Sequence, residues 1–218
     1  MLGNHSASHL DLNKTPTEIY EDDILRGEQV PKALLLGRGQ ELKYFRYPYL
    51  HAGNDIDAKV NVEQFLARHG YRIAPVTIDN QEWMFAEVYA RALRGHDSAA
   101  ARHIGAACIR YMQTMFEFLE NLSRDLVGYE IKQVLLLHDN QLNADYLDRL
   151  LTMIRNRGYK FISLDQALQD SAYTLPDTYV GPEGISWLHR WAISKGWKML
   201  QEPREPEWID RLYKAGSQ

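Results

Sequence analysis

The chain has 218 residues, of which 45% are hydrophobic and 25% charged, and its formal net charge is −4. That length fits one sizeable domain or two small ones, and the composition can bury an ordinary globular core. The weak negative charge gives no reason to expect a nucleic acid as partner. The single cysteine, Cys108, excludes an internal disulfide and a multi-cysteine metal site. No apolar run reaches the roughly 18 residues that a membrane span needs.

The first half of the chain predicts two strands with a helix between them. Residues 43–50, KYFRYPYL, are rich in aromatic side chains and predict a strand that runs into a loop. Residues 57–70 predict a helix, because they have one apolar side and end on a glycine, Gly70. Residues 71–79, YRIAPVTID, contain β-branched side chains and predict the next strand.

The second half predicts a long helix followed by strand, helix and strand. Apolar side chains recur every three or four positions over residues 98–128, which indicates one continuous helix. Residues 132–139, KQVLLLHD, form a continuous apolar run that is typical of a strand buried on both faces. We expect a helix over residues 143–158, with Asn143 as its N-cap, and a strand over residues 159–168.

This alternation favours an α/β fold, with a parallel sheet or barrel and helices outside it. Beyond about residue 170, the prolines, glycines and tryptophans indicate an irregular extension. We therefore expect a main body over residues 1–170 and a C-terminal extension over residues 171–218 that packs on it.

Three of the predicted strands end in chemically reactive residues: Arg46 and Tyr49 after the first, Asp79 and Glu82 after the second, and His138 after the third. Functional residues gather at the carboxyl ends of parallel strands, so we expect these side chains at one edge of the fold. His5 and His9 add two imidazoles, four positions apart, that could hold a metal. Such a set could hydrolyse an amide or an ester with metal assistance.

Each of these residues also has a purely structural interpretation. A histidine pair four positions apart is common on helix surfaces, His138 could be a hydrogen-bonded core histidine, and Trp83 could be a core residue. Arg46 and Asp79 could form a structural ion pair. The order of the whole set along the chain favours the functional interpretation.

Four short motifs carry a family resemblance, in this order: NHSASH (4–9), RYPY (46–49), DNQEW (79–83) and LLHD (136–139). They resemble the His-Ser/Thr-x-x-His, Arg-x-Pro-Tyr, acidic-Trp and Leu-x-His motifs of the NodB-type polysaccharide deacetylases of carbohydrate esterase family 4. The later GYKFISL (158–164) is similar to the family's GY-x-F strand. The resemblance extends to about Leu168. It implies a deformed (β/α) barrel that hydrolyses N-acetyl groups of a glycan.

The resemblance also implies a role for each motif. His5 and His9 would bind a divalent metal, with zinc as the first choice and cobalt, nickel or manganese as alternatives. The backbone amide of Tyr49 would form the oxyanion hole. His138 would protonate the leaving amine as the general acid.

Further roles follow from the same resemblance. Glu82 would tune His138, with Asp79 as the alternative, and Arg46 would hold the catalytic base. Leu136 and Trp83 would wall the small pocket that accepts the acetyl methyl group.

One motif of the family is absent before His5. It is an Asp-Asp pair that supplies the third metal ligand and the general base. We therefore expect a chain that lacks the first strand of the barrel, binds metal weakly, is inactive alone and associates with other copies through exposed strand edges. Asp22 and Asp23 follow the histidine pair, and we expect them on a solvated helix face.

The predicted partner is an N-acetylated carbohydrate, with no nucleic acid and no membrane span. Two alternatives stay open: a non-catalytic carbohydrate-binding or interaction protein of the same fold, and a hydrolase of a small non-glycan amide. The sequence leaves localisation open, although the family favours the periplasm or secretion over the cytoplasm for a full-length form.

Overall fold

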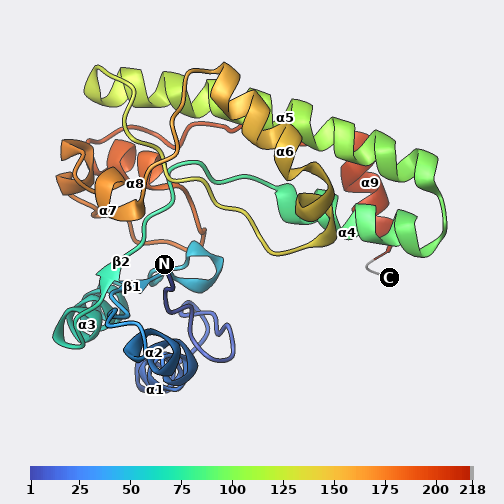
Figure 1. Ribbon diagram of the computed structural model, residues 1–218. Helices are drawn as coiled ribbons and strands as arrows, with labels where there is room; N and C mark the ends of the chain where they lie inside the picture. Colours follow the sequence, from blue (N-terminus) through green and yellow to red (C-terminus); the bar gives the residue numbers. More distant parts are fainter. Residues whose placement is uncertain (217–218) are drawn as a thin grey trace. The chain divides into compact units, whose positions relative to one another are not determined.

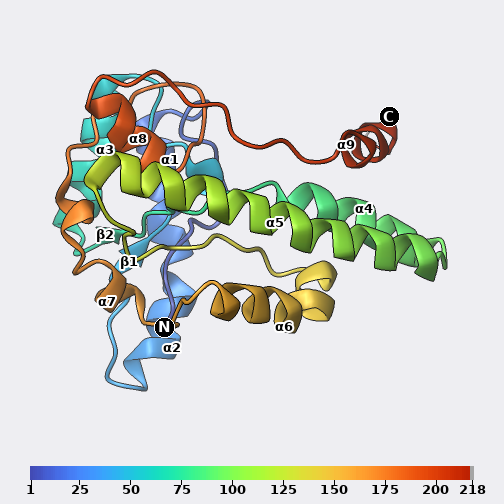
Figure 2. The same ribbon diagram turned by 90° about the horizontal axis from the view of Figure 1, so that it is seen from above.

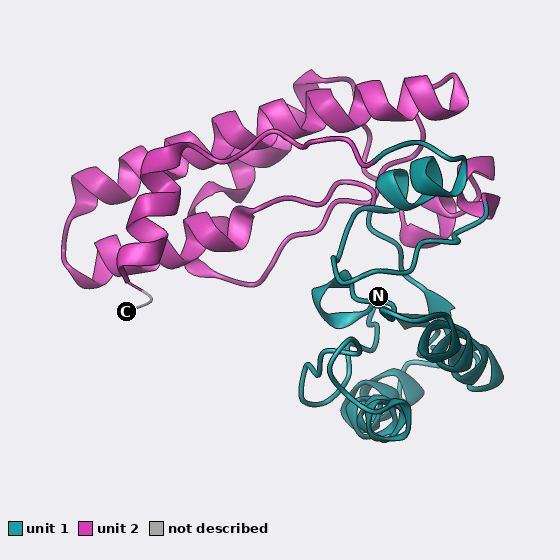
Figure 3. Cartoon of the chain, turned by 180° about the vertical axis from the view of Figure 1, so that it is seen from behind, with its two compact units in different colours: residues 1–76, 176–198 teal, residues 77–175, 199–218 magenta. Residues whose placement is uncertain are grey.

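The computed structural model describes residues 1–216, and the chain divides into two compact units (Figure 3). Unit 1 comprises residues 1–76 and 176–198, and unit 2 comprises residues 77–175 and 199–218. Each unit is therefore assembled from two stretches that lie far apart in the sequence.

Unit 1 contains four helices, one 3₁₀ turn and two short strands among its described residues: α1 (Thr17–Gly27), α2 (Gln29–Leu36), β1 (Tyr44–Phe45), η1 (Pro48–Leu50), α3 (Ile56–Arg68), β2 (Arg72–Ile73) and α8 (Trp187–Ser194). The two strands pair in parallel, with Tyr44 opposite Arg72. Helices α1 and α3 pack against each other, and Tyr20, Ile24 and Val62 are fully buried.

Buried charges tie α8 and the segment before it into unit 1. The guanidinium of Arg190 and the ammonium of Lys59 each lie 2.8 Å from Asp177 Oδ2. Both cations are almost fully buried, so this carboxylate compensates part of their desolvation. The backbone N–H of Trp187 also donates to Val76 O at 2.7 Å.

Unit 2 contains five helices and a 3₁₀ turn in the part of the chain that the structure describes: α4 (Glu82–Arg94), α5 (Ser98–Val127), α6 (Gln141–Asn156), α7 (Leu164–Ala167), η2 (Ser171–Thr174) and α9 (Glu207–Ala215). Helices α4, α5 and α6 pack against one another, and α9 packs against α4 (Figures 1 and 2). None of the described helices combines the length and the apolar character needed to cross a membrane.

The predicted helices are confirmed. Within the predicted range 98–128, residues Ser98–Val127 form α5, whose first turn is capped by the Asp97 side chain and whose end is marked by Gly128 at φ 86°. Residues 57–70 and 143–158 correspond to α3 and α6. The cap of α6 differs from the prediction: Asn140 is the N-cap, and its side chain accepts a hydrogen bond from the backbone N–H of Asn143 at 2.9 Å.

The predicted deformed (β/α) barrel is wrong. The structure is 55% helix and 3% strand, and β1 and β2 form the sheet of the described residues. The aromatic and β-branched composition of the predicted strands expresses only a local preference for extended backbone. A strand also needs a partner in register, and residues 132–139 pair with residues 71–79 only through an isolated bridge between Ile78 and Leu135.

The remaining predicted strands fail for related reasons. Over residues 43–50, only Tyr44 and Phe45 are in a strand, and the PYL segment forms η1 instead. Over residues 159–168, the chain first runs without regular structure and then forms α7. Phe161, in the part without regular structure, is 53% exposed.

Candidate functional site

The residues singled out from the sequence divide between the two units. Unit 1 holds one group: His5, His9, Arg46 and Tyr49. Unit 2 holds the other group: Asp79, Glu82, Trp83, Leu136 and His138.

In unit 1, the two predicted motifs run side by side. Asn4 forms a parallel bridge with Phe45, and the N–H of Arg46 donates to Asn4 O at 3.0 Å. The ring nitrogen Nδ1 of His5 lies 2.7 Å from Arg46 O. Residues 5–9, which we call the His loop, are thus held along the segment that carries Arg46.

Ring contacts continue this pairing. The rings of His5 and His9 meet edge to face with centroids 4.8 Å apart, and the His9 ring lies 4.6 Å from the ring of Tyr49. The Tyr49 ring lies 5.7 Å from that of His51. His51 Nδ1 in turn lies 2.6 Å from Asp11 Oδ1, and both of these side chains are mostly buried. Three imidazoles and one carboxylate therefore follow one another along a line of contacts.

Backbone strain is concentrated in the same two segments. Ser6, His9, Tyr49 and Leu50 have φ values of 63°, 53°, 57° and 57°, in the left-handed region that non-glycine residues rarely adopt. Each such residue costs about 1 kcal/mol or more, and strain of this kind gathers at functional sites. The Ser6 hydroxyl accepts a hydrogen bond from the backbone N–H of His9 at 3.0 Å, which stabilises the loop.

The histidine pair fits the ligand chemistry of a divalent metal. A carbonyl oxygen beside Nδ1 of His5 requires the proton on that nitrogen, which puts the lone pair on Nε2. A backbone carbonyl in this position is a common outer partner of metal-binding histidines. Among residues 1–216, no group of three or more His, Cys, Asp or Glu side chains is placed to hold a metal ion. If a metal binds there, the pair would provide two of the three protein ligands usual in catalytic zinc sites.

Arg46 is partly buried, and burial lowers the pKa of its guanidinium. Its Nε donates a long hydrogen bond of 3.4 Å to Ala74 O. It forms no ion pair with the residues that the structure describes. A guanidinium in such surroundings would favourably bind an anionic group.

The backbone at Tyr49 is closely covered by the loop that precedes α8. A Cβ atom at Gly184 would overlap the carbonyl oxygen of Tyr49 and would lie 3.1 Å from His51 Cδ2. The side chain of Asn13 donates to Pro182 O at 3.1 Å and anchors the same loop. The role of the Tyr49 amide in an oxyanion hole stays a prediction.

In unit 2, the central feature is a histidine–carboxylate pair. His138 Nδ1 lies 2.9 Å from Glu82 Oε2. Glu82 is 1% exposed, whereas the His138 side chain is 49% exposed. Of the two carboxylates that the sequence offers as a partner of His138, Glu82 makes the hydrogen bond.

Two asparagine side chains bind the carboxylate of this pair. The side-chain amides of Asn140 and Asn143 donate to Glu82 Oε1 at 2.5 and 2.8 Å. The same amides donate to the backbone oxygen of His138 at 3.3 and 2.8 Å. Both oxygens of Glu82 thus accept hydrogen bonds, so the carboxylate is fixed in one orientation.

Asp79, the alternative partner, belongs to a second group of acids. Burial raises the pKa of Asp79 to about 6, and burial together with repulsion from Asp79 raises the pKa of Glu202 to about 7. Asp79 Oδ1 accepts a hydrogen bond from the Asn80 N–H at 2.9 Å. The two carboxyl groups therefore hold protons at higher pH than isolated carboxyls do.

The predicted pocket residues of unit 2 have different surroundings. Trp83 lies in the first turn of α4, is 41% exposed, and meets the ring of Tyr213 in α9 edge to face with centroids 5.3 Å apart. Leu136 is half-buried, and its N–H donates to Ile78 O at 3.1 Å. Their contact with an acetyl group stays a prediction.

Sequence reasoning missed five residues at these sites: Asp11, His51, Asn140, Asn143 and Glu202. Asp11, His51 and Asn140 each follow a predicted residue by two positions, so polar residues just beyond a motif were the available signal. Glu202 lies in the segment expected to be an irregular extension, and no motif marks it.

Comparisons with protein-family models, with curated proteins and with solved structures find no match to this chain.

Proposed function

We propose that this chain carries the metal-binding and acid–base residues of a hydrolase that removes N-acetyl groups from a glycan. The order of its motifs resembles that of the polysaccharide deacetylases. The observation that carries the proposal is the hydrogen bond between His138 and the buried carboxylate of Glu82.

That pair has the chemistry of a general acid. Release of an amine requires a proton on its nitrogen, and an imidazolium can give that proton from Nε2. Glu82 holds Nδ1 of His138, which sets the ring orientation and stabilises the charged form of the ring. Asn140 and Asn143 keep the carboxylate in place while the proton moves.

His5 and His9 are the proposed metal ligands. When bound there, a divalent metal would supply Lewis acidity toward the acetyl carbonyl and toward a water molecule. The protein's own contribution is the pair of imidazoles and, from the backbone of Tyr49, an N–H for the developing negative charge.

Acetate release from N-acetylated oligosaccharides tests the proposal. The assay uses the chain as it stands and the chain fused behind a segment that ends in Asp-Asp, because the family resemblance assigns the general base to such a pair. The fused form is expected to release acetate with added zinc or cobalt. His138→Ala should lower that rate about a hundredfold or more. His103→Ala, which changes an exposed histidine of α5, serves as the control.

Three results would count against the proposal. Acetate release that does not depend on His138 would remove the general acid. Binding of the oligosaccharide without any turnover in either form would favour the carbohydrate-binding alternative. Turnover of small amides but not of N-acetylated sugars would favour the non-glycan hydrolase.

A further inference from the structure

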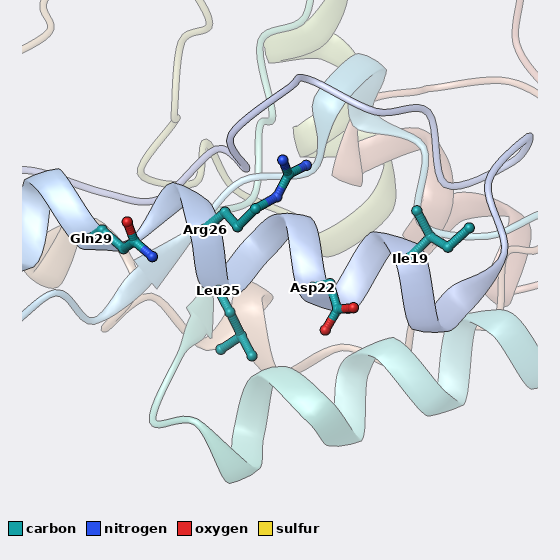
Figure 4. Close-up of a pocket in the computed structure, with 5 residues that line it drawn as sticks. All are labelled: Ile19, Asp22, Leu25, Arg26 and Gln29. Atoms are coloured by element: carbon teal, nitrogen blue, oxygen red, sulfur yellow. The ribbon is translucent and has the colours of Figure 1, made fainter.

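Helix α1 presents two different faces. Asp23 and Gly27 are four positions apart, so they lie on the same face. Asp22 is exposed and lines a pocket of about 440 Å³ on the helix surface, together with Ile19, Leu25, Arg26 and Gln29. Figure 4 shows Asp22 and Leu25 pointing to the same side of α1.

Asp23 contacts the His loop through both its side chain and its backbone. Its Oδ2 accepts a hydrogen bond from the N–H of Ser8 at 2.9 Å, and its backbone oxygen accepts one from the N–H of Ala7 at 3.1 Å. Its Oδ1 pairs with Arg26. Asp23 is 0% exposed, which corrects the expectation that it lies on a solvated helix face. Burial raises the pKa of this carboxyl, but the hydrogen bonds from Ser8 and Ser6 and the pairing with Arg26 outweigh it and lower the pKa.

Gly27 brings the backbone of α1 against the same loop. A Cβ atom at position 27 would lie 2.7 Å from Ser6 O and 2.8 Å from Ala7 N, which is far inside ordinary contact. Both neighbours are backbone atoms, so the loop would have to move as a whole to make room. Gly27 is therefore required by close approach of the chain.

We infer that α1 is the support of the His loop, with Asp23 and Gly27 as positioning residues that set its metal affinity. The His loop contains two residues in the left-handed region, Ser6 and His9, and such a conformation persists only where the surroundings over-determine it. Asp23 contacts Ala7 and Ser8, which are the neighbours of Ser6 and His9, and Gly27 lies against the backbone of Ser6 itself. These contacts supply that restraint. The inference rests on the proposed function for the identity of the ligand, and it adds how the protein holds the two imidazoles.

Metal titration of the full chain tests this support. Calorimetry measures the binding of zinc, and absorption spectroscopy measures the binding of cobalt in a second titration. Asp23→Asn should weaken the affinity about tenfold or more, in the range found for outer partners of metal ligands. Asp22→Asn removes the same charge one residue away and should change the affinity by less than about twofold, because long-range charge effects are screened. Equal effects of the two variants would overturn the inference.

A second pair of variants leaves the charge unchanged. Gly27→Ala should weaken zinc binding as Asp23→Asn does, because the added methyl group pushes the loop away from α1. Gly37→Ala is the matched control, since a Cβ at position 37 meets nothing within 4 Å. If Asp23→Asn does not fold, the two glycine variants still test whether α1 supports the His loop. Equal zinc affinity in the two alanine variants would overturn the inference.

The variant Val62→Ala tests whether metal binding is lost merely because unit 1 has become less stable. Val62 is fully buried in α3 of the same unit, so its truncation lowers stability without touching the loop. Its zinc affinity should stay within about twofold of the wild type, because the loop contacts are intact. A loss as large as that of Asp23→Asn would mean that α1 has no specific role.

Amide hydrogen exchange in the absence of metal distinguishes this inference from the proposed function. The N–H of Ser8 should lose protection in Asp23→Asn but not in Asp22→Asn. Zinc binding that does not change in His5→Ala would overturn the proposed metal site, while the exchange result still decides whether α1 holds the loop. Equal protection of Ser8 in both aspartate variants would overturn the support itself.

Discussion

In unit 1 the candidate ligands His5 and His9 are held through the backbone of their own loop, whereas in unit 2 the ring of His138 is held by a side chain. His5 contacts a carbonyl oxygen, and the His loop receives its hydrogen bonds at backbone N–H groups. His138 instead contacts Glu82, which is itself held by two asparagine side chains. The stability of a site held through its backbone should fall when a methyl group is added against that backbone. The stability of a site held by side chains should fall when one of those side chains is removed.

The largest expected effect is in unit 2. Glu82→Ala removes a buried carboxylate and leaves its hydrogen-bond donors without their acceptor. The free energy of unfolding of unit 2, from hydrogen exchange of core amides in α5, should fall by about 3 kcal/mol. Glu87→Ala changes an exposed carboxylate of the same helix and should cost less than about 0.5 kcal/mol. A small effect of Glu82→Ala would show that the side-chain network does not hold the site.

The matching test in unit 1 adds a methyl group. Gly184→Ala places a Cβ onto the carbonyl oxygen of Tyr49, so the backbone there must shift. Amide exchange in unit 1 should report a loss of about 1 to 3 kcal/mol. Gly37→Ala is again the control, and a tolerated Gly184→Ala would contradict the close covering of Tyr49.

The acid pair of unit 2 predicts a pH dependence. The pKa of Asp79 is raised to about 6 and that of Glu202 to about 7, above the values of about 3.9 and 4.3 expected in an unfolded chain. For a raised pKa, stability is fully present below the unfolded value and is lost as the pH rises through the folded value. The stability of unit 2 should therefore fall by roughly 2 to 3 kcal/mol for each of these groups between pH 4 and pH 7.

Asp79→Asn and Glu202→Gln should flatten that profile and stabilise unit 2 at neutral pH. Asp125→Asn changes an exposed carboxyl of α5 and should leave the profile as it is. Denaturant unfolding at a series of pH values measures the difference. A decline of equal size in all variants would place the titrating groups elsewhere.

The smallest expected effect is at the end of the line of contacts in unit 1. Asp11→Asn removes the charge that faces His51 but keeps the size of the side chain. We expect a loss of about 1 kcal/mol in local stability, measured by exchange of the His51 N–H, because the pair is short but partly exposed. No change relative to Asp22→Asn would mean that this pair contributes nothing.

Helices α3, α5 and α6 could be predicted from the sequence, because their signals are local, whereas α2 and α4 were not predicted and α8 and α9 lie in the segment expected to be irregular. The apolar spacing of α5, the aspartate before it and the glycine after it all lie within the element. Strands could be predicted only in part: β1 and β2 lie inside two of the predicted segments, but a strand needs a distant partner in register, and composition carries no information about that partner. The apolar run at residues 132–139 forms one isolated bridge rather than a strand.

In the candidate site, too, contacts between residues of recognisable motifs could be predicted, and contacts that only the fold creates could not. The contact between His138 and Glu82 could be anticipated, because both residues belong to recognisable motifs. The support from Asp23 could not, because the sequence places this residue in an ordinary charged helix and only the fold shows that it faces the His loop. The two asparagines at Glu82 were missed because amide side chains carry no distinctive motif.

Zinc affinity in two histidine variants tests most directly the claim that His5 and His9 are ligands and His138 is an acid. The wild type should bind one zinc ion weakly, because two protein ligands make an incomplete first shell. His138→Ala should keep that affinity within about twofold, whereas His9→Ala should abolish it. Loss of zinc in His138→Ala, or unchanged binding in His9→Ala, would contradict the account.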